Sequence, residues 1–382
     1  MRIRYVEGIG WSGGEIDTYV VVNDGPLEEQ SIVPAPSAFL IHMAQIGRRK
    51  NSIRASANDL AGFFEALHTY GQDWRKLTDR DMSGYLYGYL RVAKSCTRKS
   101  IERNVSTLRS FYANAWETGI LESPPTFTYT YVSGAEKIQG YGKRKIDFDL
   151  FNNYIEASIF DQLLSNVKAQ SPFEKERDET VLYLGYHLGL RNEEVTDSRN
   201  LRTDALTQLI ADAEKTGNRT ITVPIYGKGN KLRKIDVPPK ALSKIKSFLE
   251  GRRCGIPVGP LICKRNGGTL YTGHATDLFK AAKISASLNI DAVLTELHEK
   301  NPHLHFVTKG SFEKLSFHAL RHTYATNLVD FCYKHGYDPW QYVPEQMGHE
   351  DKATTKEYVL FDGKLHRREK IRRSLNDDFH ED

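Results

Sequence analysis

Residues 316–331 read SFHALRHTYATNLVDF, and this stretch predicts the helix around which the C-terminal half of the chain is built. Ser316 stands where a side-chain oxygen caps a helix start. Three large side chains then recur at steps of four, which is the spacing of a buried helix face: Leu320, Tyr324 and Leu328. We therefore expect a helix with one side in the core.

A second face of the same helix carries the chemistry. It gathers His318, Arg321, His322 and Ala325. A guanidinium and imidazoles held side by side on a rigid helix suit the binding of one anionic group. Two histidines also suggest a metal site, but no carboxylate completes a ligand set of the HExxH kind. We therefore expect no metal here.

Downstream, residues 338–361 read DPWQYVPEQMGHEDKATTKEYVLF. The Asp-Pro pair predicts a helix start, Gly348 predicts its end, and His349 falls at the turn. Tyr358 follows nine residues later. Taken alone, a tyrosine before Val-Leu-Phe is as well explained as a core aromatic residue.

Two upstream patches complete the pattern. In LGLRNEEV, residues 188–195, Gly189 predicts a helix end, Arg191 lies at the turn and Glu194 follows three residues later. Taken alone, that pair is typical of a surface or cap interaction. Residues 219–238 alternate around Gly-Lys-Gly-Asn and predict a β-hairpin with Lys228 at its tip. A lysine at such a tip is usually only solubilising.

Four motifs in this order, GLRNEE, GKGNKLR, HALRHTYAT and MGHEDKATTKEY, resemble the signature boxes of the tyrosine recombinase (phage integrase) family. The resemblance implies a catalytic domain at residues 157–361 with Tyr358 as nucleophile. It implies that the other catalytic residues are Arg191, Arg321, His318, Lys228 and His349, with Glu194 and His322 in support. The family's first box often begins with Thr, which is Leu188 here.

The chemistry that the resemblance implies is attack on a DNA phosphodiester. Two guanidiniums stabilise the charge that grows on the non-bridging oxygens. Tyr358 passes its proton to His318 or His322, of which the resemblance favours His318, and Lys228 protonates the leaving 5′ oxygen. The resulting 3′-phosphotyrosine keeps the bond energy, so neither ATP, a metal nor any other cofactor is expected.

The chain before this domain is expected to be helical from residue 34 to about residue 119, with the clearest pattern at 97–117. Basic residues gather where one of these helices ends and the next begins, which suits phosphate contacts as well as a solvated surface. The predicted DNA contacts are Arg98, Lys99 and Arg103, together with the later basic run Lys143, Arg144 and Lys145.

These patterns predict a mainly α protein with a small antiparallel β-hairpin. We expect an N-terminal segment of unknown role (1–33), a helical, SAM-like core-binding domain (34–123), a linker (124–156), the catalytic domain (157–361) and a C-terminal tail (362–382). The tail is equally well interpreted as a solvated helix or as a segment that packs on a neighbouring protomer.

Composition sets the class of protein. The 382 residues are 40% hydrophobic and 26% charged, with a net charge of +5, and the four cysteines form no CxxC pair. No stretch reaches the ~18 apolar residues of a membrane span, and the N-terminus lacks a signal-peptide core. We expect a soluble cytoplasmic protein of bacterial or phage origin.

The prediction is a site-specific DNA recombinase, of integrase or transposase type, that acts on double-stranded DNA with specific recombination sites. By resemblance it works as a homo-tetramer in the synaptic complex, with accessory DNA-bending proteins as further partners. Two alternatives remain: a type IB topoisomerase-like enzyme with the same chemistry, and a DNA-binding accessory protein that has lost catalysis.

Overall fold

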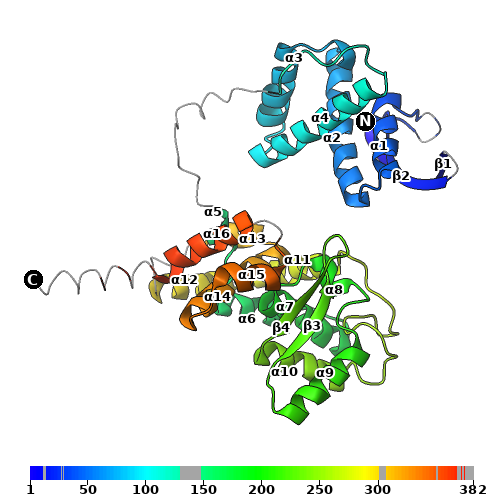
Figure 1. Cartoon of the computed structure of the whole chain (residues 1–382). Coiled ribbons are helices and arrows are strands. Elements are labelled where there is room, and N and C mark those ends of the chain that lie inside the picture. Colours follow the sequence, from blue (N-terminus) through cyan, green and yellow to red (C-terminus); the bar gives the residue numbers. More distant parts are fainter. Residues whose placement is uncertain are drawn as a thin grey trace, which may run out of the picture. The chain divides into compact units, whose positions relative to one another are not determined.

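The computed structural model describes residues 1–11, 14–26, 28, 30–129, 148–300, 307–349, 352–367, 371 and 374. The chain divides into two compact units, Met1–Gly142 and Lys143–Asp382, each with its own core. Figure 1 draws both units, and each is described here by itself. The predicted fold class, mainly α with little β structure, is confirmed.

The first unit is mostly helical. Its helical elements are α1 (Pro34–Gln45), α2 (Lys50–Tyr70), η2 (Trp74–Lys76), α3 (Asp79–Ser83), the π-helical η3 (Gly84–Ala93) and α4 (Arg98–Glu117). Gly71 ends α2 in the left-handed conformation, and Thr78 and Asp81 form a reciprocal capping box at the start of α3. Both features were expected, because they depend on short-range sequence alone.

Residues 1–33, for which the sequence predicted no structure, contain a second β-hairpin. Strand β1 (Arg2–Trp11) pairs antiparallel with β2 (Gly14–Val22), and the register shifts between Val6 and Ile9. The hairpin packs against α1 and α2, and Val21 is fully buried there. The segment is therefore part of the first unit's core, held by the apolar residues that end β2.

The second unit contains the four motifs quoted above. Its elements are α5 (Phe148–Asn153), α6 (Ala157–Ser165), α7 (Pro172–Leu188), α8 (Asn192–Thr196), α9 (Thr203–Thr216), β3 (Ile221–Tyr226), β4 (Leu232–Val237), α10 (Pro239–Glu250), α11 (His274–Ala286), α12 (Ile290–Lys300), α13 (Lys309–Lys314), α14 (Phe317–Lys334), α15 (Pro339–Met347), α16 (Lys352–Asp362) and the π-helical η4 (Gly363–Arg367). Strands β3 and β4 form the predicted antiparallel hairpin.

Helix α14 is the predicted central helix, and it lies between two hydrophobic cores. Leu320 and Ala319 belong to the larger core, which also holds α7. Ala325 and Val329 belong to a smaller core shared with α15 and α16. In Figure 1 these three helices lie side by side, as their contacts require. Ser316 occupies the predicted cap position, but its side chain makes no capping hydrogen bond.

Both ends of the predicted linker, residues 124–156, are packed against a core instead of being exposed. Phe127 is buried in the core of the first unit, and the Thr128 N–H donates to Asp79. Leu150 packs on the core beneath α14, and Ile155 is fully buried with its N–H donating to Thr323 Oγ1. Apolar burial at both ends thus leaves a shorter connection than residues 124–156.

The start of the predicted tail also packs. Asp362 is fully buried, Leu365 is buried, and Arg367 donates to Asp362 at 2.8 Å. The end of α16 and η4 are therefore fixed to the second unit, because the Leu365 side chain and the Asp362 carboxylate have left water.

Candidate active site

Glu194 is the buried centre of the candidate site. Gly189 (φ +61°) ends α7 in the left-handed conformation, which turns the chain so that α8 starts directly after Arg191. The Arg191 N–H and Nη1 donate to the Glu194 carboxylate at 2.9 and 2.7 Å. Arg233 on β4 donates to both carboxylate oxygens, at 2.7 and 2.8 Å.

These partners stabilise the ionised form of Glu194. Burial, with 2% of the side chain exposed, would raise its pKa, but the hydrogen bonds and charge of Arg233 and the charge of Arg321 lower the pKa to about 2. Glu194 is therefore ionised at neutral pH. It fixes the guanidinium of Arg191, which remains about a quarter exposed.

Arg321 is buried where two helices end. It donates to the carbonyl oxygen of Gly189 at 2.5 Å and to that of Met347, and it lies 3.9 Å from Glu194. Burial first, and then the charge of Arg191, lower its pKa to about 9, so the guanidinium still carries its charge at neutral pH. The two predicted arginines thus share one carboxylate.

Tyr358 on α16 faces the same interior. Its hydroxyl is 2.8 Å from Nδ1 of His322, and only 4% of the residue is exposed. Burial raises the pKa of the phenol to about 12, against the opposing charge of Arg321. The hydroxyl is therefore protonated at neutral pH and lies within hydrogen-bond distance of an imidazole nitrogen.

The other two histidines lie around this pair. His318 is exposed and packs edge-on against His322, with ring centroids 4.6 Å apart. The His349 ring lies parallel to that of Tyr358, with centroids 5.8 Å apart. Its Nδ1 is 3.1 Å from Thr355 Oγ1, and burial and then the charge of Arg321 lower its pKa to about 3. His349 is thus a neutral ring packed on the phenol.

Lys228 lies apart from these buried groups. It is exposed in the turn between β3 and β4, where Gly229 and Asn230 both adopt positive φ. Arg199 hydrogen-bonds the Asn230 side chain and lies over the Tyr226 ring, which supports the turn from outside. The ammonium is therefore presented to solvent on a tight turn.

With this geometry in hand, comparison with known proteins identifies the family. A sequence model described as the phage integrase family matches residues 153–362, more than half of the chain. The chain belongs to the phage integrase family. The model of the phage integrase N-terminal SAM-like domain matches residues 37–119. The resemblance read from the four motifs is confirmed.

Relatives cover most of the chain. Tyrosine recombinase XerC of Alcanivorax borkumensis is 26% identical over 85% of this chain and 89% of its own length. Tyrosine recombinase XerD of Shewanella oneidensis is 26% identical over 85% of this chain and 91% of its own. The prediction of a tyrosine recombinase is confirmed at the level of this homology.

Solved structures share the integrase fold. XerH site-specific recombinase in a post-cleavage complex with palindromic difH substrate superposes with a TM-score of 0.57, at 17% identity, covering 88% of this chain and 82% of that one. A lambda integrase dimer bound to a COC′ core site gives a TM-score of 0.53, at 13% identity, covering 85% and 76%. At these identities the likeness shows the fold alone.

Arg233 is the site residue that the motifs did not single out. It lies inside the quoted GKGNKLR box, but its partner Glu194 is 39 residues away in sequence. The position of Arg233 is unusual for a cation, because it lies in a strand whose residues alternate between more exposed and more buried positions. Alternation alone cannot say which carboxylate such an arginine meets.

Two of the three predicted DNA contacts in the first unit have partners within the chain. Arg98 pairs with Glu102 at 2.9 Å, and Arg103 pairs with the buried Asp59 at 2.7 Å while more than half of the arginine side chain remains exposed. Lys99 is exposed. Lys143, Arg144 and Lys145 lie outside the described residues.

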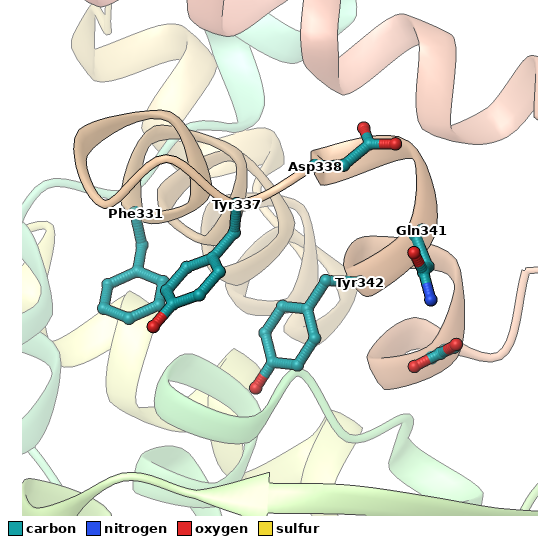
Figure 2. A pocket seen from close by; sticks show the side chains of 6 residues that line it. Phe331, Tyr337, Asp338, Gln341 and Tyr342 are labelled. Atoms are coloured by element: carbon teal, nitrogen blue, oxygen red, sulfur yellow. The ribbon is translucent and has the colours of Figure 1, made fainter.

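A separate hollow of about 420 Å³ lies between the end of α14 and α15. Figure 2 shows Phe331 and Tyr337 beside each other, Tyr342 next to them, Asp338 at the cap position just before α15, and Gln341 on α15. None of the candidate catalytic residues is among those that line it. The hollow is therefore distinct from the site built around Glu194.

In the described part of the chain, no group of three or more His, Cys, Asp or Glu side chains is placed to hold a metal ion. No helix in those ranges has the length and apolar character needed to cross a membrane.

Proposed function

We propose that this protein is a site-specific DNA recombinase, of integrase or transposase type, in which Tyr358 cleaves DNA through a covalent 3′-phosphotyrosine. One observation carries the proposal: the phenol of Tyr358, hydrogen-bonded to His322 at 2.8 Å, lies in the same buried region as the paired guanidiniums of Arg191 and Arg321. Membership of the phage integrase family supports it.

The phosphate would be bound by Arg191 and Arg321. Arg321 keeps its charge at neutral pH. Glu194 fixes the guanidinium of Arg191, and the helix-end carbonyls fix that of Arg321. Preorganised donors of this kind stabilise the charge that develops on non-bridging oxygens, and one such donor is worth on the order of 3 kcal/mol in the transition state. Attack also requires the phenol of Tyr358, which is buried here, to become accessible.

Proton transfer would run through the histidine pair and Lys228. A phenol whose pKa is about 12 must lose its proton as it attacks. His322 Nδ1 lies 2.8 Å from the hydroxyl, and the exposed His318 packs on His322. The leaving 5′ oxygen would take a proton from Lys228, whose exposed turn suits contact with DNA. His349 would hold the Tyr358 ring by packing.

The two units would then have different roles in the reaction. The first unit would bind DNA as a core-binding domain through Arg98, Lys99 and Arg103. The run Lys143–Lys145 would add DNA contacts at the start of the second unit, which would perform catalysis. We place the protein in the bacterial cytoplasm, or in that of a phage host, since the relatives are bacterial recombinases. Its partners would be double-stranded DNA with specific recombination sites, three further copies in a synaptic tetramer, and accessory DNA-bending proteins.

Covalent trapping tests the nucleophile. On a nicked suicide substrate that carries the recombination site, wild-type protein should form a protein–DNA adduct resolved by denaturing electrophoresis. Tyr358→Phe should form none, because the attacking oxygen is gone. Tyr337→Phe is the matched control, since Tyr337 is 59% exposed and lies outside the site, and it should trap like wild type.

Three results would contradict the proposal. An adduct formed by Tyr358→Phe would exclude Tyr358 as the nucleophile. Efficient relaxation of supercoiled plasmids without any recombination site would instead favour a topoisomerase-like enzyme, which shares the chemistry but not the exchange of partners. Absence of any adduct with wild-type protein would favour an accessory role.

A further inference from the structure

Arg233 uses all three of its guanidinium nitrogens inside the site. Nη1 and Nη2 donate to the two oxygens of Glu194 at 2.7 and 2.8 Å, and Nε donates to the carbonyl oxygen of Gln346 at 3.0 Å. Only 10% of the side chain is exposed. This fork geometry is specific to arginine, because a lysine ammonium is a point charge without it.

The contacts join three segments that carry candidate catalytic groups. Arg233 lies on β4, five residues after Lys228 in the same hairpin. Glu194 holds Arg191 at the start of α8. Gln346 lies near the end of α15, three residues before His349. A single side chain therefore links the lysine hairpin, the arginine pair and the turn that bears His349.

The backbone on both sides is shaped around this guanidinium. A Cβ at Gly227, the residue before Lys228, would lie 2.9 Å from Arg233 Nη1 and 3.0 Å from Glu194 Oε1. A Cβ at Gly348, the residue before His349, would lie 3.0 Å from Arg233 Cδ. Side chains at those two positions would displace Arg233, so both motif glycines make room for it.

The hairpin also contacts α15 through hydrogen bonds that do not involve Arg233. The Asp236 N–H donates to Gln346 Oε1 at 2.8 Å, and Asp236 accepts from the Tyr342 hydroxyl at 2.9 Å. The base of the hairpin is therefore held even without Arg233. What Arg233 adds is the link to Glu194, and through it to Arg191 and Arg321.

We propose that Arg233 is a positioning residue for strand cleavage, which acts through Glu194 to fix Arg191 and Arg321 against the scissile phosphate. The inference rests on the proposed function, because it assigns a role within that same site. Arg233 itself touches no reacting atom. Removing a donor that touches the reacting atoms typically lowers the rate about 100- to 1,000-fold. Loss of Arg233 should therefore lower the cleavage rate by less, on the order of 10- to 100-fold.

The first experiment compares full-length variants in single-turnover cleavage of the suicide substrate, with DNA affinity measured by fluorescence anisotropy. Arg233→Gln should lower the cleavage rate on the order of 10- to 100-fold with little change in affinity. Arg233→Lys keeps a positive charge beside Glu194 and so protects folding, but it should still lose rate because it lacks the fork. Lys234→Gln, the exposed neighbour on β4, is the matched control and should cleave like wild type.

A second substrate separates positioning from a loss of folded protein. A methylphosphonate at the cleavage position lacks one anionic non-bridging oxygen, so its reaction depends less on well-placed guanidiniums. The rate loss of Arg233→Gln should therefore be several-fold smaller on the methylphosphonate than on the phosphate. A fraction of unfolded enzyme would lower both rates equally, and that result would overturn the inference.

A double-mutant cycle tests the route through Glu194. If Arg233 acts through Glu194, the double variant Glu194→Gln with Arg233→Gln should lose no more rate than the worse single variant, whereas independent effects would multiply. Multiplied losses, or wild-type cleavage by Arg233→Lys, would refute the role of Arg233. If wild-type protein forms no adduct on the substrate, the proposed function fails instead.

Discussion

At the scale of single residues, Glu194 has the most partners in the site. Three arginines surround one buried carboxylate, two of them through hydrogen bonds of 2.7 to 2.8 Å. Such buried pairs are costly to break, because removing one partner leaves uncompensated charge in the interior. The carboxylate therefore contributes to stability as well as to the placement of the arginines.

Glu194→Gln should lower the free energy of unfolding at pH 7 by about 3 kcal/mol or more. The pKa of Glu194 is lowered from 4.5 to about 2, so its contribution is complete above pH 4.5 and is lost as pH falls through 2. Urea denaturation of wild type and variant should show a difference that shrinks over this range. Glu193→Gln, at an exposed neighbour, is the control, and equal losses in both variants would contradict the assignment.

Short-range spacing indicates some contacts of the site but not others. The spacing of Arg191 and Glu194 at a helix start predicted a surface or cap interaction between them, and in the structure they do pair, with the Glu194 side chain buried. The hydrogen bond of Tyr358 to His322 and the fork of Arg233 on Glu194 join residues 36 and 39 positions apart. Such contacts depend on how helices pack, which local periodicity does not specify.

At the scale of elements, the helix ends decide where the arginines lie. Gly189 ends α7 with φ +61°, and a Cβ there would lie 2.4 Å from Cδ1 of the Tyr324 ring on α14. Gly217 ends α9 with a similar φ of +71°, but nothing lies within 4 Å of its would-be Cβ. The two glycines share a backbone requirement and differ in the space around them.

This difference predicts the outcome of alanine substitution. Gly217→Ala should cost about 1–2 kcal/mol of stability from the left-handed conformation alone. Gly189→Ala should cost a further 1–3 kcal/mol or so, because the methyl group collides with Tyr324 and pushes α7 from α14. Thermal unfolding of both variants measures the difference. Equal costs would mean that the Tyr324 ring moves aside freely.

Among the elements, those with short-range signals were predicted. The patterned helix at 97–117 corresponds to α4, and the hairpin at 219–238 contains β3 and β4. The β1–β2 hairpin was missed because glycines at positions 8, 10 and 14 interrupt its alternation of apolar and polar residues. Its stability comes from packing on α1 and α2, which is a tertiary effect.

At the scale of the whole molecule, the proposal assigns DNA binding to both units and catalysis to one. Because each unit has its own core, the second can be prepared alone. Phosphate contacts release counterions, and each contact adds about 0.9 to the slope of log affinity against log salt. The number of contacts made by each unit is therefore measurable.

The full chain should bind its site with a steeper salt dependence than the second unit, residues 143–382, alone. Fluorescence anisotropy between roughly 50 and 200 mM salt should show slopes that differ by several units if the first unit grips phosphates. Arg103→Gln would report whether a cation paired with Asp59 takes part, with Arg103→Lys as the control that keeps the positive charge at this position. Equal slopes for the long and short chains would remove DNA binding from the first unit.

Because Arg321 lies at the ends of two helices, their dipoles affect how its positive charge is compensated. Gly189 and Met347 offer it the carbonyl oxygens that close α7 and α15, where the negative ends of both helix dipoles lie. Oriented peptide groups thus help to compensate this cation, so Glu194 need not neutralise it alone. Three guanidiniums and one carboxylate leave a surplus of two positive charges, which equals the double negative charge of a five-coordinate phosphorus passing from DNA to tyrosine.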